Sequence, residues 1–186
     1  MNTAFEPAQS IELAAHELEA EYFEYSKAAN PISANLISRI PYHCFPSSLY
    51  DSGPSPLLPL DLGDSLGCEC PATGPGLCAN FIRLNANDTL TLAPNATSQV
   101  LYVIDGNGSL SYGDQTFDWT KGCFIALPGM HHTDLKASSN ARFYYVHDEP
   151  LLRYLGVKVN EDRFNATLYP AEVANAKLRE AADDPR

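Results

Sequence analysis

Short apolar runs alternate with turn signals at nearly regular spacing over residues 100–146, and this pattern constrains the fold more than any other feature. The run at 100–104 reads VLYVI, which is rich in the β-branched and aromatic residues that favour strands. Gly, Asn, Asp and Pro punctuate the intervals, and Gly and Asn accept the positive φ of tight turns. This spacing predicts an all-β sandwich or barrel, with strands at 100–104, 109–112, 115–119, 123–127 and 142–146.

Two more strands are expected upstream, at 80–84 and 89–92, and two helices downstream, at 150–155 and 171–182. Pro170 suits the first turn of the last helix, because its missing N–H has no partner there. The predicted organisation is therefore an N-terminal helix and Pro-rich arm packed on the barrel, the barrel itself, and a C-terminal helix and tail. Their residue ranges are 1–75, 76–170 and 171–186.

The first 76 residues contain a predicted helix and a connector rich in proline. Apolar residues recur at three- and four-residue steps over 10–29, which predicts an amphipathic helix that must dock on the barrel or on a second subunit. Prolines prevent long regular elements over 31–76. The same segment is rich in Leu, Ile, Phe and Tyr, so we expect an irregular arm wrapped over the barrel.

Composition excludes several classes of partner. The 186 residues contain 12 Lys and Arg against 23 Asp and Glu, a formal net charge of −11, which disfavours nucleic acid and anionic membrane surfaces. No run of 18 apolar residues would span a membrane, and the first residues lack the pattern of a secretory leader. Five cysteines, an odd number, are expected to be reduced. We therefore expect a cytoplasmic protein.

The order of motifs resembles the cupin family of small jelly-roll barrels. A strand ends in a Gly-rich turn at 102–108, a W-x-x-G-x-x-x-x-L-P-G step runs over 119–129, and His132 follows. Residues 146–157, VHDEPLLRYLGV, add a likeness to the gentisate 1,2-dioxygenase-like cupins. The resemblance covers roughly 76–170 and implies an all-β cupin jelly roll. Such proteins usually carry two barrels, so the resemblance implies a homodimer or a partner cupin.

The resemblance also implies a metal site, from which this chain departs. Metal-binding cupins supply H-x-H and a Glu from one motif and a third His from the second. Here the H-x-H positions fall near Ala93 and Asn95, or Asn95 and Thr97, and the Glu position near Gln99 or Leu101. Because His132 alone survives, we expect no metal or cofactor. If Fe(II) binds instead, its ligands would come from His132, His131 and His43.

His132 is the candidate catalytic residue. The cupin resemblance turns it inward, where it could be an acid/base of a pocket or a satisfied core histidine. Strand parity suggests four aromatic residues as pocket lining, with plain core packing as the alternative, and two arginines could receive a carboxylate. These substrate-binding candidates are Tyr102, Trp119, Phe143, Tyr145, Arg83 and Arg142.

Two aspartates and three cysteines allow both a structural and a functional interpretation. Asp134 shares strand parity with His132 and could orient it or simply lie in a loop, and Asp148 is expected to cap the following helix. The spacing of Cys68, Cys70 and Cys78 is a weak match to zinc, and a redox role stays open.

Three functions remain after this reading. The first is a cupin with a degenerate metal site that binds a small aromatic or carboxylate molecule, or serves as a non-catalytic partner. The second is a non-haem Fe(II) ring-cleaving dioxygenase of the gentisate type, as the resemblance implies. The third is a metal-free acid/base enzyme that uses His132.

Overall fold

The computed structural model falls into two compact units, residues 1–40 and 41–186. It describes residues 14, 15, 17, 18, 20, 24–36, 41–51 and 56–182. No helix among them is both long enough and apolar enough to cross a membrane.

The described residues of the first unit include one short helix, α1 (Tyr25–Ala28), which has no buried residue. The helix expected over 10–29 is present only at Tyr25–Ala28, because the described residues from Ala14 to Glu24 are turn or irregular. An isolated helix of this length is marginal in water unless its apolar stripe packs on a partner, and Leu18 is exposed. Ala14, Ala15 and Tyr25 of the expected stripe are exposed as well, and Ile11 and Tyr22 lie outside the described residues.

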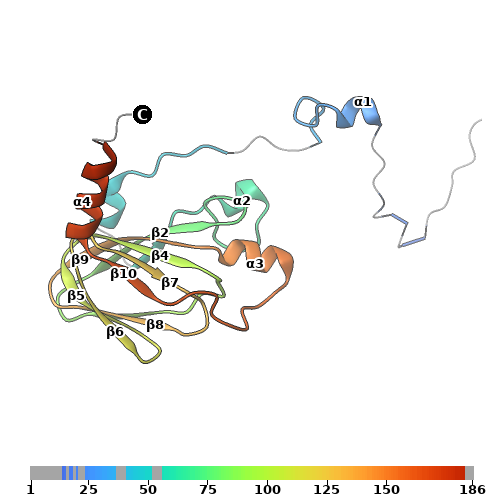
Figure 1. Ribbon diagram of the computed structural model, residues 1–186. Helices are drawn as coiled ribbons and strands as arrows, with labels where there is room; N and C mark the ends of the chain where they lie inside the picture. Colours follow the sequence, from blue (N-terminus) through green and yellow to red (C-terminus); the bar gives the residue numbers. More distant parts are fainter. Residues whose placement is uncertain are drawn as a thin grey trace, which may run out of the picture. The chain divides into compact units, whose positions relative to one another are not determined.

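The second unit is built on two antiparallel sheets packed face to face (Figure 1). The larger sheet has the strand order β1 (Leu57–Pro59), β2 (Cys78–Leu84), β9 (Ala141–His147), β4 (Gln99–Asp105), β7 (Phe124–Leu127) and β10 (Thr167–Tyr169). The smaller sheet has the order β3 (Thr89–Leu92), β8 (Thr133–Ala137), β5 (Asn107–Tyr112) and β6 (Gln115–Thr120).

The strand order is that of a jelly roll. The first and last core strands, β2 and β9, pair along their whole length, with Ile82 opposite Phe143. The second and next-to-last, β3 and β8, pair in the other sheet, and β4 and β7 pair in the first. This nesting of strands that are far apart in sequence makes two Greek keys. The predicted all-β jelly roll is confirmed.

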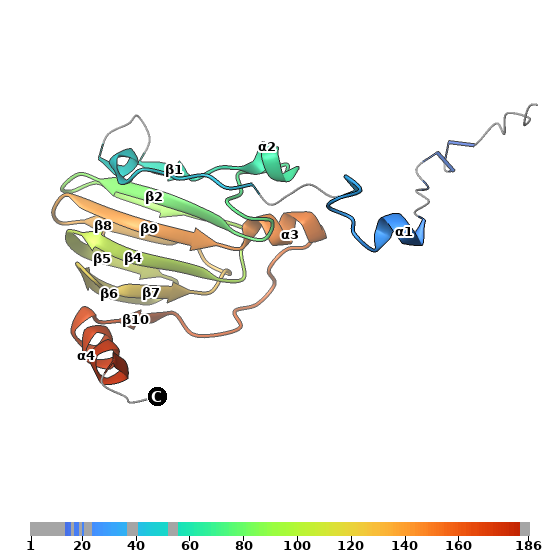
Figure 2. The same ribbon diagram turned by 90° about the horizontal axis from the view of Figure 1, so that it is seen from above.

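The described part of the second unit also contains four helices outside the two sheets: η1 (Ser47–Tyr50), α2 (Gly63–Leu66), α3 (Glu149–Leu155) and α4 (Ala171–Ala182). The helices expected at 150–155 and 171–182 match α3 and α4. Parts of the Pro-rich segment lie on the barrel, because Tyr50 stacks edge-on against Phe81 with ring centroids 5.0 Å apart. Strand β1, which the sequence analysis did not predict, extends the larger sheet beside β2 (Figure 2).

The core lies between the sheets and is formed by alternate residues of each strand. Trp119 of β6 and Phe143 of β9 meet edge to face across it, with ring centroids 4.7 Å apart, and both are fully buried. Gly108 makes room for the indole: a Cβ there would lie 2.1 Å from the Lys136 carbonyl oxygen and 2.6 Å from the Trp119 ring. The lack of a side chain at Gly108 therefore decides how closely Trp119 can pack on β5.

Candidate functional site

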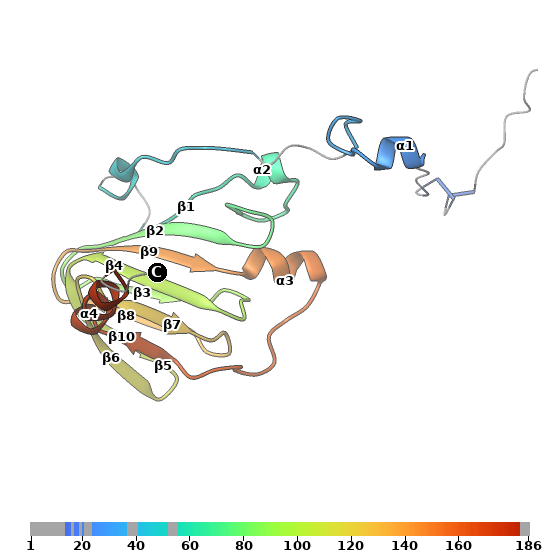
Figure 3. The same ribbon diagram turned by 45° about the horizontal axis from the view of Figure 1, so that its top comes forward.

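The inner face of the larger sheet becomes polar at one end of the barrel, the end from which α3 continues β9 (Figure 3). Cys78 and Gln99 flank His147 in register on the neighbouring strands. One pair further in, Asn80 lies opposite Tyr145. Apolar side chains form the rest of the buried cluster between the sheets. A buried polar group is costly unless it is paired, so this end needs a specific account.

A hydrogen-bond network satisfies part of this end. Tyr145 donates its hydroxyl to Gln99 Oε1 at 2.7 Å, and Gln99 Nε2 donates to the Pro128 carbonyl at 3.0 Å. Asn80 Nδ2 donates to the carbonyls of Cys78 and Tyr145 at 3.3 and 3.4 Å. Burial raises the pKa of Tyr145 well above its ordinary value, so its hydroxyl stays a proton donor. The network holds these side chains in one arrangement.

His147 is the histidine that faces this end. Its ring lies 5.2 Å from the Tyr145 ring, and its Nδ1 accepts the backbone N–H of Glu149 at 3.3 Å. Burial lowers the pKa of His147, although the nearby Glu149 and Asp148 carboxylates act in the opposite sense. The ring is therefore neutral at pH 7. Because Nδ1 accepts a hydrogen bond, the proton of the neutral ring lies on Nε2, which makes Nε2 a donor.

A cavity of about 180 Å³ opens at this end. The larger sheet lines it with Cys78, Asn80 and His147, and α3 lines it with Glu149 and Arg153. Arg153 pairs with Glu149 one helical turn away, Nη2 to Oε1 at 2.7 Å. A second cavity of about 500 Å³, formed by the loop after α2 and by α3, also includes Arg153 in its lining. A cation and a hydrogen-bond donor thus border one small space at the barrel mouth.

His132 does not face the interior. It precedes β8, is exposed, and has its Nε2 3.5 Å from Asp134 Oδ2. The inward residues of β8 are Thr133, Leu135 and Ala137, so the expected orientation was off by one residue, and one residue reverses the face of a strand. Asp134 does lie beside His132, and it also accepts a hydrogen bond from Thr91 Oγ1 at 2.5 Å.

The other two candidate histidines are also outside the barrel. His131 is exposed and packs edge-on against Tyr112, with centroids 5.3 Å apart. His43 is exposed and packs on Phe45 at 4.5 Å. Across the described residues, no three His, Cys, Asp or Glu side chains form a group that could hold a metal ion.

The positions that the cupin pattern assigns to metal ligands carry other interactions. Asn95 Nδ2 donates to the Val157 carbonyl, and Asn95 Oδ1 accepts the backbone N–H of Val159. Thr97 donates its hydroxyl to Asp148. Gln99 is held by Tyr145 and by the Pro128 carbonyl. Neutral amides and a hydroxyl that are already engaged do not suit Fe(II), which prefers imidazole and carboxylate ligands. The donor set therefore does not fit an iron site.

The predicted substrate-binding residues separate into two groups. Trp119, Phe143 and Tyr145 are buried between the sheets. Tyr102 lies on the outer face of the larger sheet instead, with its ring 4.6 Å from that of Phe124. The outward turn of Tyr102 again reflects an expected parity that was off by one residue.

Neither predicted arginine lies at the cavity. Arg142 is on the outer face, with Nε 3.2 Å from Asp51 Oδ1 and Nη1 3.8 Å from Asp105 Oδ2. Its guanidinium also lies over the Tyr50 ring, 5.9 Å from the centroid. Arg83 is the register partner of Arg142 on β2 and shares its face. The cation at the cavity is Arg153, which was not predicted.

Asp148 does not cap α3 with its side chain. Its carboxylate instead accepts the backbone N–H groups of Thr97 and Ser98 at 2.8 and 3.2 Å, and the Thr97 hydroxyl. This links the end of β9 to the loop before β4.

The sequence analysis did not select His147 as a site residue. The sequence signal that could have identified it was the alternation Phe143, Tyr145, His147, which puts His147 on the inner face.

The cysteines are free thiols. Burial raises the pKa of Cys78 to about 11, and it also raises the pKa of Cys70. Both are therefore protonated at pH 7 and are weak nucleophiles.

The fold is a jelly-roll barrel with a polar mouth. The family model of the AraC-like ligand binding domain matches residues 83–156. A salicylate 1,2-dioxygenase from Pseudoaminobacter salicylatoxidans, crystallised as an adduct with gentisate, aligns with a TM-score of 0.48 and 18% identity over 61% of this chain and 28% of its own. A cupin superfamily protein from Desulfitobacterium hafniense aligns with a TM-score of 0.42 and 9% identity, covering 54% of this chain and 84% of its own.

The chain thus spans just over a quarter of the length of the salicylate dioxygenase. A search of curated protein sequences found no match. The chain has a jelly-roll fold, and over residues 83–156 it is similar to the AraC-like ligand binding domain.

Proposed function

We propose that this protein binds a compact aromatic or carboxylate-bearing molecule at the polar mouth of its barrel, and that it does so without a metal. The cavity of about 180 Å³ lined by Asn80, His147 and Arg153 carries the proposal. Small barrels bind one compact ligand among inward side chains near the mouth. A family model named for a ligand-binding domain supports the same general role.

The lining chemistry favours an oxygen-bearing ligand. His147 offers an Nε2–H donor, since Glu149 occupies its Nδ1. Arg153 offers a planar cation that matches a carboxylate in two parallel hydrogen bonds. Glu149 holds Arg153 in the ligand-free protein, Nε to Oε1 at 2.9 Å. A ligand carboxylate would compete with Glu149 for this guanidinium, which selects for anionic molecules that also accept from His147.

Binding can be tested by NMR titration of the labelled protein with benzoate, hydroxybenzoates and their uncharged amides. We expect shifts at Asn80 and His147 with the carboxylates, and at least tenfold weaker binding to an Arg153→Ala variant. Arg163→Ala is the matched control, because Arg163 pairs with Glu161 at 2.9 Å on an exposed loop away from this cavity. Equal loss in both variants, or shifts confined to the outer surface, would contradict the proposal.

The metal-free part needs its own measurement. Elemental mass spectrometry on protein purified without a tag or chelator is expected to find substoichiometric, mixed metals. About one iron per chain would contradict the proposal and favour ring-cleaving dioxygenase activity, which oxygen uptake with gentisate would then test. Acid/base catalysis by His132 in a barrel pocket has no support in its exposed position.

A further inference from the structure

A larger cavity adjoins the small one at the barrel mouth. Its volume is about 500 Å³, against about 180 Å³ at the mouth, and its lining comes from α2, the loop after α2 and α3, with no residue of either sheet. We call it the α2–α3 cavity. Figure 1 and Figure 2 both show α2 and α3 at the same end of the barrel. Cys70 and Arg153 line both cavities, so the two spaces meet at these side chains.

The walls of the α2–α3 cavity are held in place. In the loop wall, Asp61 Oδ1 accepts the backbone N–H groups of Gly63 and Ala72 at 2.8 and 2.9 Å. The backbone is closely packed there, because a Cβ at Gly63 would lie 2.8 Å from the Cys70 carbonyl oxygen. The other wall is α3, which the buried side chain of Leu152 anchors to the rest of the unit. Sites for small molecules are usually pre-formed in this way.

The lining of the α2–α3 cavity is mostly apolar. Its apolar side chains are Leu66, Pro75, Pro150, Leu151 and Tyr154. Leu151 and Tyr154 are 42% and 85% exposed, so an apolar occupant would remove their surface from water, which favours binding. Among the described lining residues Glu69 is the only acidic one, and its side chain is exposed. The cavity therefore suits an apolar group.

We propose that the ligand is a monocarboxylate with an apolar tail, whose carboxylate pairs with Arg153 at the barrel mouth and whose tail lies in the α2–α3 cavity. This inference rests on the proposed function and names its ligand class. Cavities for small molecules usually have volumes of about 300–1,000 Å³. The mouth cavity is smaller than that and has room for a head group, whereas the α2–α3 cavity lies within the range. Because Arg153 stands where the two meet, one molecule can place its charge on the guanidinium and its chain along the apolar lining.

Isothermal titration calorimetry of the full chain with butanoate, hexanoate and octanoate tests this proposal. Each added methylene group should tighten binding to the wild type about fourfold, because it is removed from water. Uncharged octanamide should bind about tenfold more weakly than octanoate, since it lacks the charge that pairs with Arg153.

Gly76→Leu should remove the dependence on chain length. A Cβ at Gly76 would lie 3.7 Å from the Leu151 Cβ, so a leucine side chain would occupy the cavity. The backbone of Gly76 does not have a positive φ, and a side chain is therefore tolerated. Gly74→Leu is the matched control and should keep the dependence, because Gly74 does not line the cavity and nothing lies within 4 Å of a Cβ there. Circular dichroism checks folding, and Leu151→Glu replaces Gly76→Leu if that variant does not fold.

Equal affinity of the wild type for the three acids would overturn the proposal. A chain-length dependence that persists in the folded cavity variant would also overturn it, since the tail would then bind elsewhere. In both cases benzoate that still shifts Asn80 and His147 would leave the proposed function standing. Failure of every carboxylate to bind would contradict the proposed function and this inference together.

Discussion

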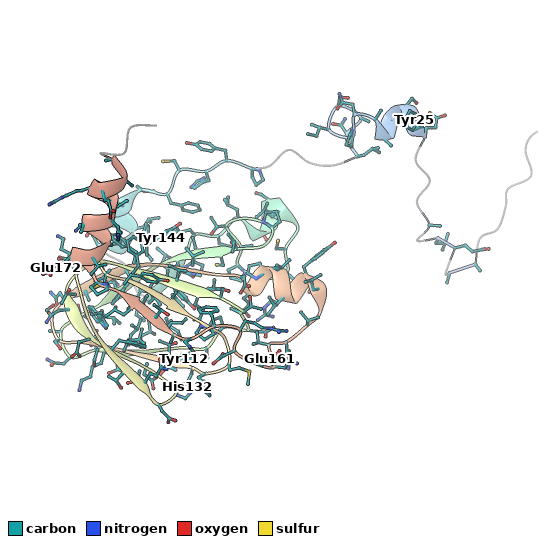
Figure 4. All side chains as sticks on the ribbon, viewed as in Figure 1. Tyr25, Tyr112, His132, Tyr144, Glu161 and Glu172 are labelled. Carbon is teal, nitrogen blue, oxygen red and sulfur yellow. The ribbon has the colours of Figure 1, made fainter. Side chains whose placement is uncertain are left out.

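The two sheets of the barrel share one core and present opposite outer faces. The larger sheet carries Tyr144, Tyr102 and Phe124 in register on its outside. The smaller sheet has there a row of Thr91, Asp134, Ser111 and Thr116 in register. Its next row is equally polar, with Thr89, Lys136, Ser109 and Asp118. Figure 4 shows Tyr144 and His132 on opposite sides of the barrel.

The difference separates two demands on a strand. The inward residues of both sheets are mostly apolar, because both sheets bury them in the shared core. The environment outside the sheet determines which side chains are favourable at the outward positions. In an antiparallel sheet that faces water, inward apolar residues alternate with outward polar residues. The smaller sheet follows that rule, whereas the outer face of the larger sheet leaves Tyr144 and Phe124 exposed near its middle.

The largest expected effect comes from breaking the core that the two sheets share. Phe143→Ala should lower the free energy of unfolding by about 3–5 kcal/mol, because it leaves a cavity against Trp119 at the contact between the sheets. Urea denaturation measures the loss, and Phe143→Leu should cost much less. A loss below about 1 kcal/mol for the alanine variant would show that this contact does not hold the sheets together.

A smaller loss of stability is expected when a side chain is added to β5 next to the buried Trp119. Gly108→Ala should cost roughly 3 kcal/mol, since the added Cβ would meet the Lys136 backbone and the Trp119 ring. Gly74→Ala is the control, because nothing lies within 4 Å of a Cβ there. Thermal unfolding of the two variants checks the prediction, and equal melting temperatures would contradict it.

The same hydroxyl group should matter on one face of β9 and not on the other. Tyr145→Phe leaves Gln99 Oε1 buried without its donor at 2.7 Å and should cost about 1–3 kcal/mol. Tyr144→Phe, one residue away on the exposed face, should stay within about 0.5 kcal/mol. Urea denaturation of both variants measures the contrast. It disappears if the Gln99 amide can find another partner.

The smallest effect is a pH dependence at the polar end of the larger sheet. Burial holds the pKa of His147 in the folded protein below its ordinary value of 6.5, so below pH 6.5 the unfolded chain takes up a proton that the folded chain does not readily bind. Stability due to His147 is therefore complete above pH 6.5 and falls as the pH drops through that value toward the folded pKa. The difference in unfolding free energy between pH 7.5 and 5.5 should shrink in His147→Gln. An unchanged difference would show that other groups cause it.

The accuracy with which the sequence predicts helices and strands differs from one element to the next. Strands with β-branched and aromatic runs between Gly or Asn turns, such as 100–104 and 142–146, were predicted within one or two residues. The helix at 171–182 was predicted with the same bounds. The three-residue strand β1 was missed, because Leu57–Pro59 becomes a strand only by pairing with β2. The helix over 10–29 was overpredicted from its periodicity alone.

Site prediction depended on orientation more than on residue type. The candidate histidines, arginines and aromatics were chosen by residue type and expected strand parity, but His132 and Tyr102 face outward because that parity was off by one residue. His147 and Gln99 form the polar end only because three strands from distant parts of the chain meet in register. Arg153 reaches the cavity from a helix that follows β9.

The sequence by itself determined an all-β jelly roll, because alternating apolar residues and turn residues act through local sterics and burial. It also determined the absence of the usual cupin ligand residues. Only the tertiary structure decided which side chains share the barrel mouth and which sheet exposes its aromatics. Register and face are set by the pairing of strands far apart in the chain, and no local pattern carries that information.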